Sequence, residues 1–279
     1  MKECIFLFIF IAHITAVYAQ NTTQTVTQNF DCGNNCQATL YSDGTFEVKP
    51  INPNQQASMT NYSVLREGNK WYSTAPWLTS DYIEDIQKVV ISENVQNISF
   101  AGFYFAENVT EVILPEGLTQ ITPHAFGGSG ISNIILPNTL TEIGTCSFDY
   151  SALESIIIPD SVTTIGREAF YSCKSLKSVV IGDGITSVGN NAFGNIASDA
   201  KIYCQNTSAR QCDTLLTDTT GGKNQLVLYT KQDGYYIVGN QRYRTLENMQ
   251  KDISAKRIYT VDEAVKISGN KNSVSLRYK

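Results

Sequence analysis

The sequence of 279 residues has few histidines, the side chain that most often serves as a metal ligand or a general base. It contains two histidines, of which only His124 remains if the apolar N-terminal segment is removed. The spacing of its cysteines suits no common zinc cluster, and no G-x-G-x-x-G or P-loop pattern is present. We therefore predict no metal site, no nucleotide site and no other cofactor.

Long hydrophobic runs are equally scarce, with one exception at the N-terminus. Lys2 is followed by the apolar run CIFLFIFIAHITAV and then by VYA, which fits a small-residue cleavage site. We interpret residues 1–19 as a secretory signal peptide. No later segment approaches the about 18 unbroken apolar residues of a spanning helix, so no transmembrane segment is predicted in the mature chain. The expected location is secreted or extracellular, including the cell surface.

Cysteines are few, and six of the seven follow the predicted cleavage site. An oxidising compartment favours disulfides between them. Two close pairs flank the central region and are predicted to be bridged, namely Cys32 with Cys36 and Cys204 with Cys212. Cys146 and Cys173 either pair or remain as small buried apolar residues, and the sequence leaves both possibilities open.

Sequons for N-glycosylation occur at five positions, and their use depends on a eukaryotic source. These candidate acceptors are Asn21, Asn61, Asn97, Asn108 and Asn206.

The central region contains an internal repeat of 22 or 23 residues. One anchor of the repeat is a phenylalanine, at Phe103, Phe126, Phe148, Phe170 and Phe193. A second anchor ends an apolar run, at Ser92, Pro115, Pro137, Pro159 and Gly182. Both anchors give the same intervals, which predicts a solenoid whose units bury their apolar faces against one another. About five repeats fit within residues 81–206.

One unit shows how such a core is built. In LKSVVIGDGITSVGNNAF, residues Leu176, Val179 and Ile181 match the L-x-x-L-x-L spacing of leucine-rich repeats, with the last two on one face of a short strand. Ile185, Val188 and Phe193 supply further apolar groups. We interpret these repeated positions as packing residues and assign no chemistry to them.

Packing inside the solenoid does not dictate the outward-facing strand positions. One outward column is aliphatic throughout: Val90, Ile113, Ile135, Ile157 and Val180. A bordering column is mostly acidic: Glu93, Glu116, Asn138, Asp160 and Asp183. With strands about 4.8 Å apart, the aliphatic column predicts an exposed ladder about 20 Å long with a negative border. Either β-branched residues simply suit strands, or the ladder is a contact surface for a partner or for another part of the chain.

The repeat units ILPEGLTQITPHAF, ILPNTLTEIGTCSF and IIPDSVTTIGREAF resemble the BspA-type, or treponemal-type, leucine-rich repeats of secreted and surface proteins. The segments CGNNCQATLYSDGTFEV, MTNYS and APW are similar to the N-terminal cap that often precedes such repeats. The repeat pattern leads to the same expectation of a cap, because a solenoid needs atypical end units over its apolar ends. We expect Trp71 and Trp77 to pack over the first repeat. The resemblance implies adhesion or surface contact through a protein or glycan ligand.

The C-terminal residues differ in charge from the rest. Residues 225–279 hold ten Lys or Arg and five Asp or Glu, whereas the whole chain has a net charge of −5. LVLYTKQ, YYIVG and SVSLRYK predict strands, with a turn at Asp233-Gly234 between the first two, and TLENMQKDI and TVDEAVKISGN predict short helices. The basic residues are spread out and no nucleic-acid motif is present, so we expect no nucleic-acid partner. Docking of this segment on the acidic border is the alternative role.

These observations predict an α/β-type leucine-rich repeat solenoid dominated by short parallel strands, with an N-terminal β cap and a small C-terminal α+β domain. The expected organisation is a signal peptide (1–19), tail and cap (20–80), solenoid (81–206), linker (207–224) and C-terminal domain (225–279).

An enzyme is not predicted. His124, Asp149 and Ser151 are the residue types of a catalytic triad, but they occupy positions that vary between repeats. His124, for example, aligns with Cys146 and Glu168, two residues before the repeated phenylalanine. We predict a secreted or cell-surface protein that binds proteins or mediates adhesion through its outward sheet. The alternative is a structural matrix or coat component that self-assembles.

Overall fold

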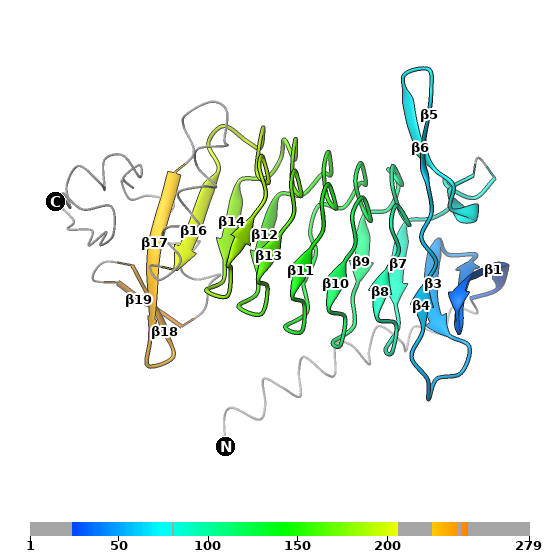
Figure 1. Cartoon of the computed structure of the whole chain (residues 1–279), viewed down its shortest axis with the longest axis horizontal. Helices are drawn as coiled ribbons and strands as arrows, with labels where there is room; N and C mark the ends of the chain where they lie inside the picture. The colour runs from blue at the N-terminus through cyan, green and yellow to red at the C-terminus, as the bar shows by residue number, and fades with distance from the viewer. Residues whose placement is uncertain (1–23, 80, 206–224, 239–240, 245–279) are drawn as a thin grey trace.

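The computed structural model describes residues 24–79, 81–205, 225–238 and 241–244 of the chain (Figure 1). Several sequence expectations fall outside these residues and remain predictions. They are the signal peptide (1–19), the sequons at Asn21 and Asn206, the linker (207–224), Cys212 and the two C-terminal helices.

An antiparallel sheet forms one end of the molecule. Strands β1 (Val26–Asn34), β2 (Cys36–Tyr41) and β3 (Thr45–Pro50) pair in order, and β4 (Ser58–Met59) pairs with β1. The predicted turn at Asp43-Gly44 joins β2 to β3. Strand β3 then pairs in parallel with β7 (Lys88–Ile91), so the terminal sheet and the solenoid share one continuous hydrogen-bonded ladder.

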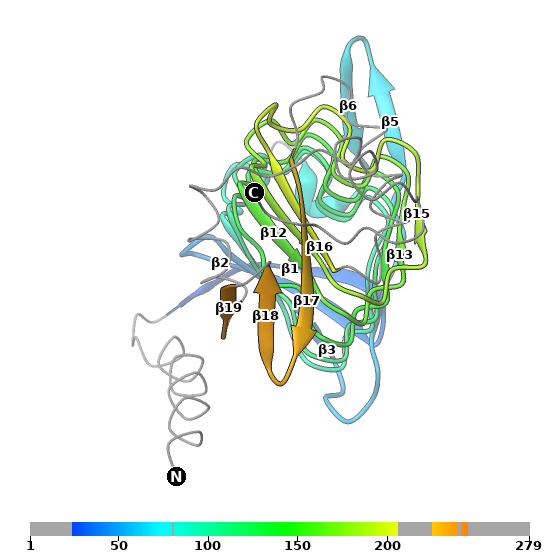
Figure 2. The same ribbon diagram turned by 90° about the vertical axis from the view of Figure 1, so that its left-hand side faces the viewer.

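Two sets of short parallel strands run along the solenoid, on opposite sides of its coil (Figure 2). The longer strands are β7, β9 (Glu111–Ile113), β12 (Ser155–Ile158), β14 (Ser178–Ile181) and β16 (Lys201–Gln205). The two-residue strands are β8 (Asn97–Ile98), β10 (Gln120–Ile121), β11 (Glu142–Ile143), β13 (Thr164–Ile165) and β15 (Ser187–Val188). The expected strand at residues 133–136 is not formed, although Ile134 and Leu136 are buried there as in the other units.

The repeated phenylalanines form a continuous stack through the core. Neighbouring rings from Phe103 to Phe193 lie nearly parallel, with centroids 5.5, 5.6, 5.4 and 4.9 Å apart, and all five side chains are fully buried. At the N-terminal end Phe46 and Trp77 close the stack by packing against Phe103. Burial of about 1.5–3 kcal/mol per large apolar side chain explains why the phenylalanine recurs in every unit.

The turns beside this stack have a recurring left-handed residue. The residue two positions before each phenylalanine has a positive φ, for example 57° at His124, 52° at Cys146 and 55° at Glu168. Its amide donates a hydrogen bond to the next unit, as from His124 to the Thr145 carbonyl and from Cys146 to the Arg167 carbonyl. These bonds hold each turn on its neighbour, so the side chains at this position stack along the solenoid.

Helix is almost absent from the described residues, which corrects the α/β-type expectation for the repeat units. Among the described residues the only helix is one 3₁₀ turn, η1 (Pro76–Leu78). Tight turns rather than helices connect the strands of each unit. A unit has only 22 or 23 residues, and two strands and the phenylalanine turn occupy most of them.

The hairpin of β5 (Val64–Glu67) and β6 (Lys70–Ser73) projects from the body of the molecule (Figure 1). Trp71 lies on it, and its side chain is 46% exposed. The expectation that both tryptophans pack over the first repeat is therefore correct for Trp77 and wrong for Trp71.

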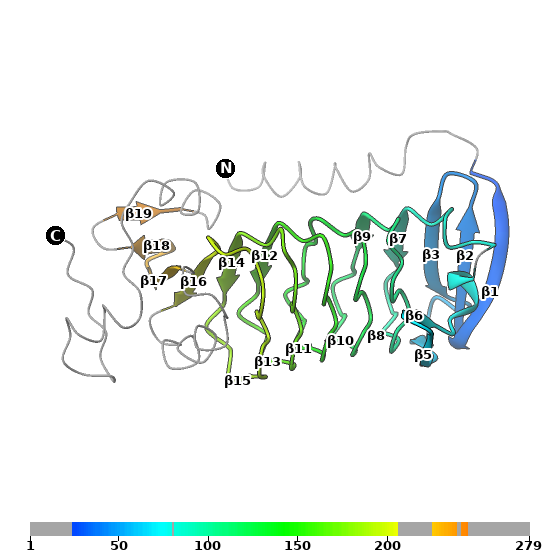
Figure 3. The same ribbon diagram turned by 90° about the horizontal axis from the view of Figure 1, so that it is seen from above.

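Three further strands lie at the far end of the solenoid (Figure 3). Strand β17 (Gln225–Gln232) pairs in parallel with β16, and β18 (Tyr235–Val238) and β19 (Gln241–Tyr243) follow in antiparallel order. The strands predicted from LVLYTKQ and YYIVG and the Asp233-Gly234 turn are present and extend the solenoid sheet. The strand predicted from SVSLRYK lies outside the described residues. Arg242 and Arg244 both lie over the Tyr235 ring, at 4.4 and 5.6 Å from its centroid.

Candidate functional site

The aliphatic column lies on the outward face of the longer strands, as the alternation of side chains requires. The register aligns Glu47, Val90 and Ile113 in one row and Ile157, Val180 and Tyr203 in another. Ile135 is 74% exposed, Ile157 42% and Ile113 40%, whereas Val90 is half-buried. Three large aliphatic side chains are therefore in contact with solvent along this face.

Val180 does not belong to the exposed strip and is a correction to the predicted ladder. Its side chain is fully buried. Tyr203 on β16 is its neighbour in register, and Tyr229 on β17 donates a hydrogen bond of 3.0 Å from its hydroxyl to the Ile181 carbonyl. Both tyrosines are themselves buried. The additional C-terminal strands therefore shorten the accessible strip at this end.

A polar cluster limits the strip at its other end. Glu47, which is paired with Val90, accepts hydrogen bonds from Tyr41 at 2.8 Å and from Lys49 at 2.9 Å. Burial and the neighbouring Glu47 carboxylate raise the pKa of Tyr41, so its hydroxyl remains a donor at neutral pH. The exposed aliphatic residues are thus bounded by polar groups on β3 and by tyrosines on β16 and β17.

The acidic border is exposed at all five of its positions and also has a structural role. The exposed residues are Glu93, Glu116, Asn138, Asp160 and Asp183. Glu116 accepts a hydrogen bond from the Asn138 amide at 3.3 Å, and Asp160 accepts one from the Asp183 amide at 3.3 Å. Each bond joins one repeat to the next, so the border residues help to hold the turns together as well as giving this edge its negative charge.

Every cysteine within the described residues is buried. Cys32 and Cys36 form a disulfide within the N-terminal sheet, as predicted. Cys204 is disulfide-bonded, and its predicted partner Cys212 lies outside the described residues, so that pairing remains a prediction. Cys146 and Cys173 are free thiols, which resolves the alternative between pairing and burial in favour of burial.

Of the three described sequons, two are accessible. Asn61 and Asn108 are exposed, although Asn61 accepts a hydrogen bond from the Phe100 amide and Asn108 donates to Glu84. Asn97 is only partly exposed, and its sequon serine, Ser99, is fully buried. The folded chain therefore offers Asn61 and Asn108 more readily than Asn97.

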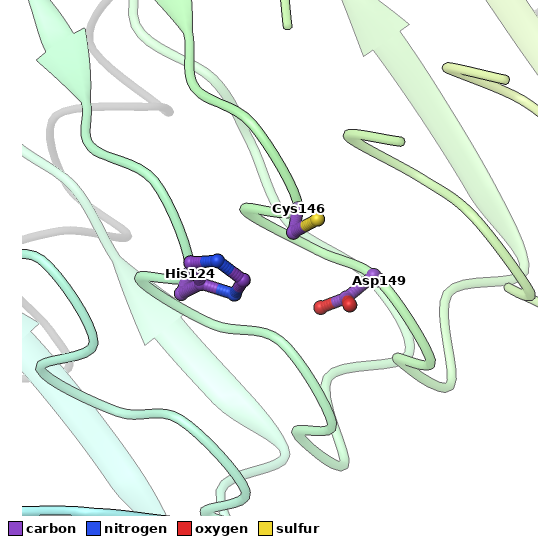
Figure 4. A group of neighbouring side chains, drawn as sticks. All are labelled: His124, Cys146 and Asp149. Atoms are coloured by element: carbon purple, nitrogen blue, oxygen red, sulfur yellow. The ribbon is translucent and has the colours of Figure 1, made fainter. Parts of the chain in front are cut away.

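Three potential metal-ligating side chains that belong to no recognised sequence motif lie close together (Figure 4). His124, Cys146 and Asp149 each present one nitrogen, sulfur or oxygen atom, and these atoms lie within 4.8 Å of one another. Asp149 is 7% exposed and Cys146 8% exposed. Glu168 adds a carboxylate oxygen 3.7 Å from the Cys146 sulfur.

Two polar atoms of this cluster have unmet hydrogen-bonding capacity. Within the described part of the chain, His124 Nδ1 and Asp149 Oδ1 are buried and have no hydrogen-bond partner. A buried polar atom without a partner costs about 1–3 kcal/mol, so a native structure rarely retains two together without compensation.

Burial also disfavours charge in the cluster. It raises the pKa of Asp149 to about 7, with a further contribution from the Glu168 carboxylate. It raises the pKa of the Cys146 thiol to about 12, again reinforced by the neighbouring carboxylates. Burial lowers the pKa of His124, which is flanked edge-on by the rings of Phe100 and Tyr104. All three side chains are therefore driven toward their neutral forms.

His124 aligns with Cys146 and Glu168 in the repeat, and the variation at this position favours a packing or surface role when the sequence is considered alone. The stacked turns bring them together, because residues one repeat apart are neighbours in a solenoid. Asp149 joins them because it follows the stacked phenylalanine of the same turn as Cys146. Comparing equivalent positions across repeats for ligand-type residues would have found the cluster.

Comparison with known proteins places the repeats in a family. The family described as "BspA type Leucine rich repeat region" matches residues 81–199 in six copies, one more than the five counted from the phenylalanine anchors. Residues 81–199 thus form a BspA-type leucine-rich repeat region. No curated protein shows significant similarity to the chain.

Several solved structures resemble the chain at low sequence identity. A leucine-rich repeat protein from Eubacterium ventriosum is 17% identical, with a TM-score of 0.42 and coverage of 73% of each chain. A leucine-rich repeat protein of T. pallidum is 19% identical, with a TM-score of 0.37, covering 68% of this chain and 95% of that one. A leucine-rich cell surface protein from Faecalibacterium prausnitzii is 16% identical, with a TM-score of 0.37, covering 77% and 59% respectively.

Within the described residues, no helix has the length and hydrophobicity needed to cross a bilayer.

Proposed function

We propose that this chain is a secreted or cell-surface leucine-rich repeat protein that binds a protein or glycan ligand through the outward face of its longer strands. The contact strip consists of Ile113, Ile135 and Ile157, with Val90 at its edge. The proposal assigns it no catalytic activity. Adhesion is the form of binding that we expect from the BspA-type character of the repeats.

The observation that carries the proposal is the exposure of Ile135. A side chain of this size that is 74% exposed, between two others that are 42% and 40% exposed, keeps apolar surface in water along one strip. Contiguous exposed apolar surface is characteristic of contact sites. The acidic border beside the strip gives a ligand with complementary basic groups a defined orientation.

The terminal sheets have a supporting role in this proposal. β1 to β4 cap the N-terminal end, since Phe46 and Trp77 cover the first phenylalanine of the stack. At the other end β17 covers the edge of β16, and the buried Tyr229 anchors it to β14. Strand β3 thus covers the edge of β7, and β17 covers the edge of β16, so neither solenoid strand has an open edge for pairing with another chain.

The test is capture of ligands from cell-surface and matrix extracts by the wild-type chain and by the double variant Ile135→Thr, Ile157→Thr. Threonine keeps the β-branched shape, so the variant is expected to fold with an unchanged circular dichroism spectrum. Captured partners should be lost from the double variant. Leu65→Thr is the matched control, because Leu65 is 44% exposed but lies on the β5–β6 hairpin, and it should capture as the wild type does. Equal capture by the double variant and the control would refute the role of the strip.

Self-assembly as a matrix or coat component is the second candidate function, favoured by the same exposed strip, which is able to contact a second copy. Sedimentation velocity over a range of protein concentrations separates the two. Growth of oligomers with concentration, abolished in the double variant, identifies self-assembly, whereas a monomer at all concentrations leaves foreign ligands as the partners.

A further inference from the structure

The turns beside the phenylalanine stack contain a ligand set that binding through the outward face does not explain. Imidazole nitrogen, thiolate sulfur and carboxylate oxygen together are the donor types that bind zinc and similar divalent transition metals. Here they come from His124, Cys146 and Asp149, whose donor atoms lie within 4.8 Å of one another (Figure 4). We propose that these three residues form a binding site for one zinc-class divalent metal ion.

The ligands are held by backbone that the repeat makes rigid. His124 and Cys146 occupy the same left-handed position of successive turns, and the amide of each is bonded at 3.0 Å to the following unit. Asp149 directly follows Phe148, whose ring stacks on Phe126 at 5.6 Å and on Phe170 at 5.4 Å. A site on such supports is preorganised, because only side-chain rotation is needed to complete it.

The distances are compatible with small adjustments. Tetrahedral zinc ligands at 2.0–2.3 Å from the metal lie about 3.3–3.6 Å from one another. Donor atoms at most 4.8 Å apart therefore have to approach by about 1 Å, which is within reach of rotations about the side-chain bonds. Glu168, with its oxygen 3.7 Å from the Cys146 sulfur, is a candidate for the fourth position.

The two partnerless atoms point to the same conclusion independently. His124 Nδ1 and Asp149 Oδ1 are buried without a hydrogen-bond partner in the described residues, and Asp149 is more than nine-tenths buried. A metal ion would satisfy both atoms. Its two positive charges would also balance the negative charges of a thiolate ligand and a carboxylate ligand.

Space for the ion depends on a glycine in the neighbouring turn. Gly127 occupies the position equivalent to Asp149 one repeat earlier, and a Cβ there would clash with Asp149 Oδ1 and approach the Tyr104 ring to 2.8 Å. The side-chain-free residue thus leaves room beside the carboxylate. Gly127→Ala is therefore a way to fill the site without altering any ligand.

The test uses the full chain without a polyhistidine tag, prepared under reducing conditions with chelator, and titrated with Co²⁺. We expect one equivalent to bind and to give a thiolate-to-cobalt charge-transfer band together with visible bands of tetrahedral intensity. Cys146→Ser should abolish the charge-transfer band. His124→Asn and Asp149→Asn should weaken binding by about 100-fold or more, beyond the 10–100-fold that supporting residues cause.

Cys173→Ser is the matched control, because Cys173 is the other buried free thiol and it bonds to Ser151 and Phe148 rather than to the cluster. It should keep the band at full intensity. Gly127→Ala should lose it while retaining the circular dichroism spectrum of the wild type. No thiolate band in a folded wild-type chain, or a band that survives in Cys146→Ser, overturns the proposal. Should Cys146→Ser fail to fold, His124→Asn decides, because His124 is the more exposed ligand.

Discussion

The indole nitrogen of Trp77 donates a 2.7 Å hydrogen bond to the carbonyl of Gly102, 25 residues further along the chain. This bond ties the turn before the first repeat to the phenylalanine turn of that repeat, next to Phe103. It joins the terminal sheet to the solenoid at the point where the aromatic stack begins.

Replacing Trp77 is expected to destabilise the fold strongly. Trp77→Ala removes a fully buried side chain and should lower the free energy of unfolding by about 3–5 kcal/mol. Trp77→Phe retains most of the volume but leaves the Gly102 carbonyl without its donor, for an expected loss of about 1–3 kcal/mol. The control Trp71→Ala, on the exposed hairpin, should change stability by less than about 0.5 kcal/mol. Urea unfolding measures all three, and equal effects at Trp71 and Trp77 would contradict the assignment.

A similar loss of stability is expected when a phenylalanine in the middle of the stack is replaced. Phe148 is fully buried between Phe126 and Phe170, so Phe148→Ala should cost about 3–5 kcal/mol by leaving a cavity between two rings. Tyr150→Ala, two residues away and 58% exposed, serves as the control and should cost less than about 1 kcal/mol. A small loss for Phe148→Ala would mean that the stack does not carry the stability of the core.

A substitution at Gly166 tests whether neighbouring turns approach each other closely. A Cβ at this position would clash with the backbone of Thr145 in the preceding unit, and backbone atoms are unable to move aside cheaply. Gly166→Ala should therefore destabilise the fold by about 1–3 kcal/mol or more. The control is Thr164→Ala, two residues earlier on β13. Thermal unfolding followed by circular dichroism compares them, and similar melting temperatures for the two variants would be evidence against the close contact.

Cys173 should be unreactive in the native protein. Its sulfur lies 3.2 Å from the Ser151 hydroxyl and donates to the Phe148 carbonyl at 3.1 Å, and burial raises the pKa of the thiol to about 12. Iodoacetamide at pH 8 should leave Cys173 unmodified until the chain is unfolded, as peptide mass spectrometry would show. Rapid native labelling at Cys173 would rule out the buried thiol.

The raised pKa of Cys173 also affects stability at alkaline pH. Between the ordinary value of 9.0 and the folded value of about 12, the native state keeps a proton that the unfolded state loses. Stability should therefore be unaffected by this group below pH 9 and should fall as the pH rises from about 9 to about 12. Cys173→Ser should show a smaller decline over the same range in urea unfolding, and identical profiles would exclude this contribution.

Much of the fold could be predicted because the same pattern of apolar residues recurs in each repeat. Phe126, Phe148 and Phe170 recur at a fixed interval, and a fixed interval of apolar residues is sufficient to specify a stacked coil. The strands around Asp43-Gly44 and the buried Cys32–Cys36 pair were likewise local features. The unformed strand at residues 133–136 shows that an apolar pattern places side chains in the core without guaranteeing a regular ladder.

The candidate sites were less accessible to sequence reasoning. Val180 has the same side-chain type as Val90, and only the position of β16 and β17 explains why it is buried. The lack of α-helix in the described part was also missed, since the resemblance to leucine-rich repeats does not state how each unit is closed. His124, Cys146 and Asp149 follow no local spacing motif, so the search for common zinc patterns passed over them.

The sequence by itself determined the period of the solenoid, the residues that fill its core and the face that its alternating strands turn outward, because these depend on periodicity and hydrophobicity along the chain. Only the tertiary structure decided which outward residues stay exposed and which donor atoms meet. Both depend on contacts between residues that are a full repeat or more apart, and such contacts form when successive units stack, at a register that no single unit encodes.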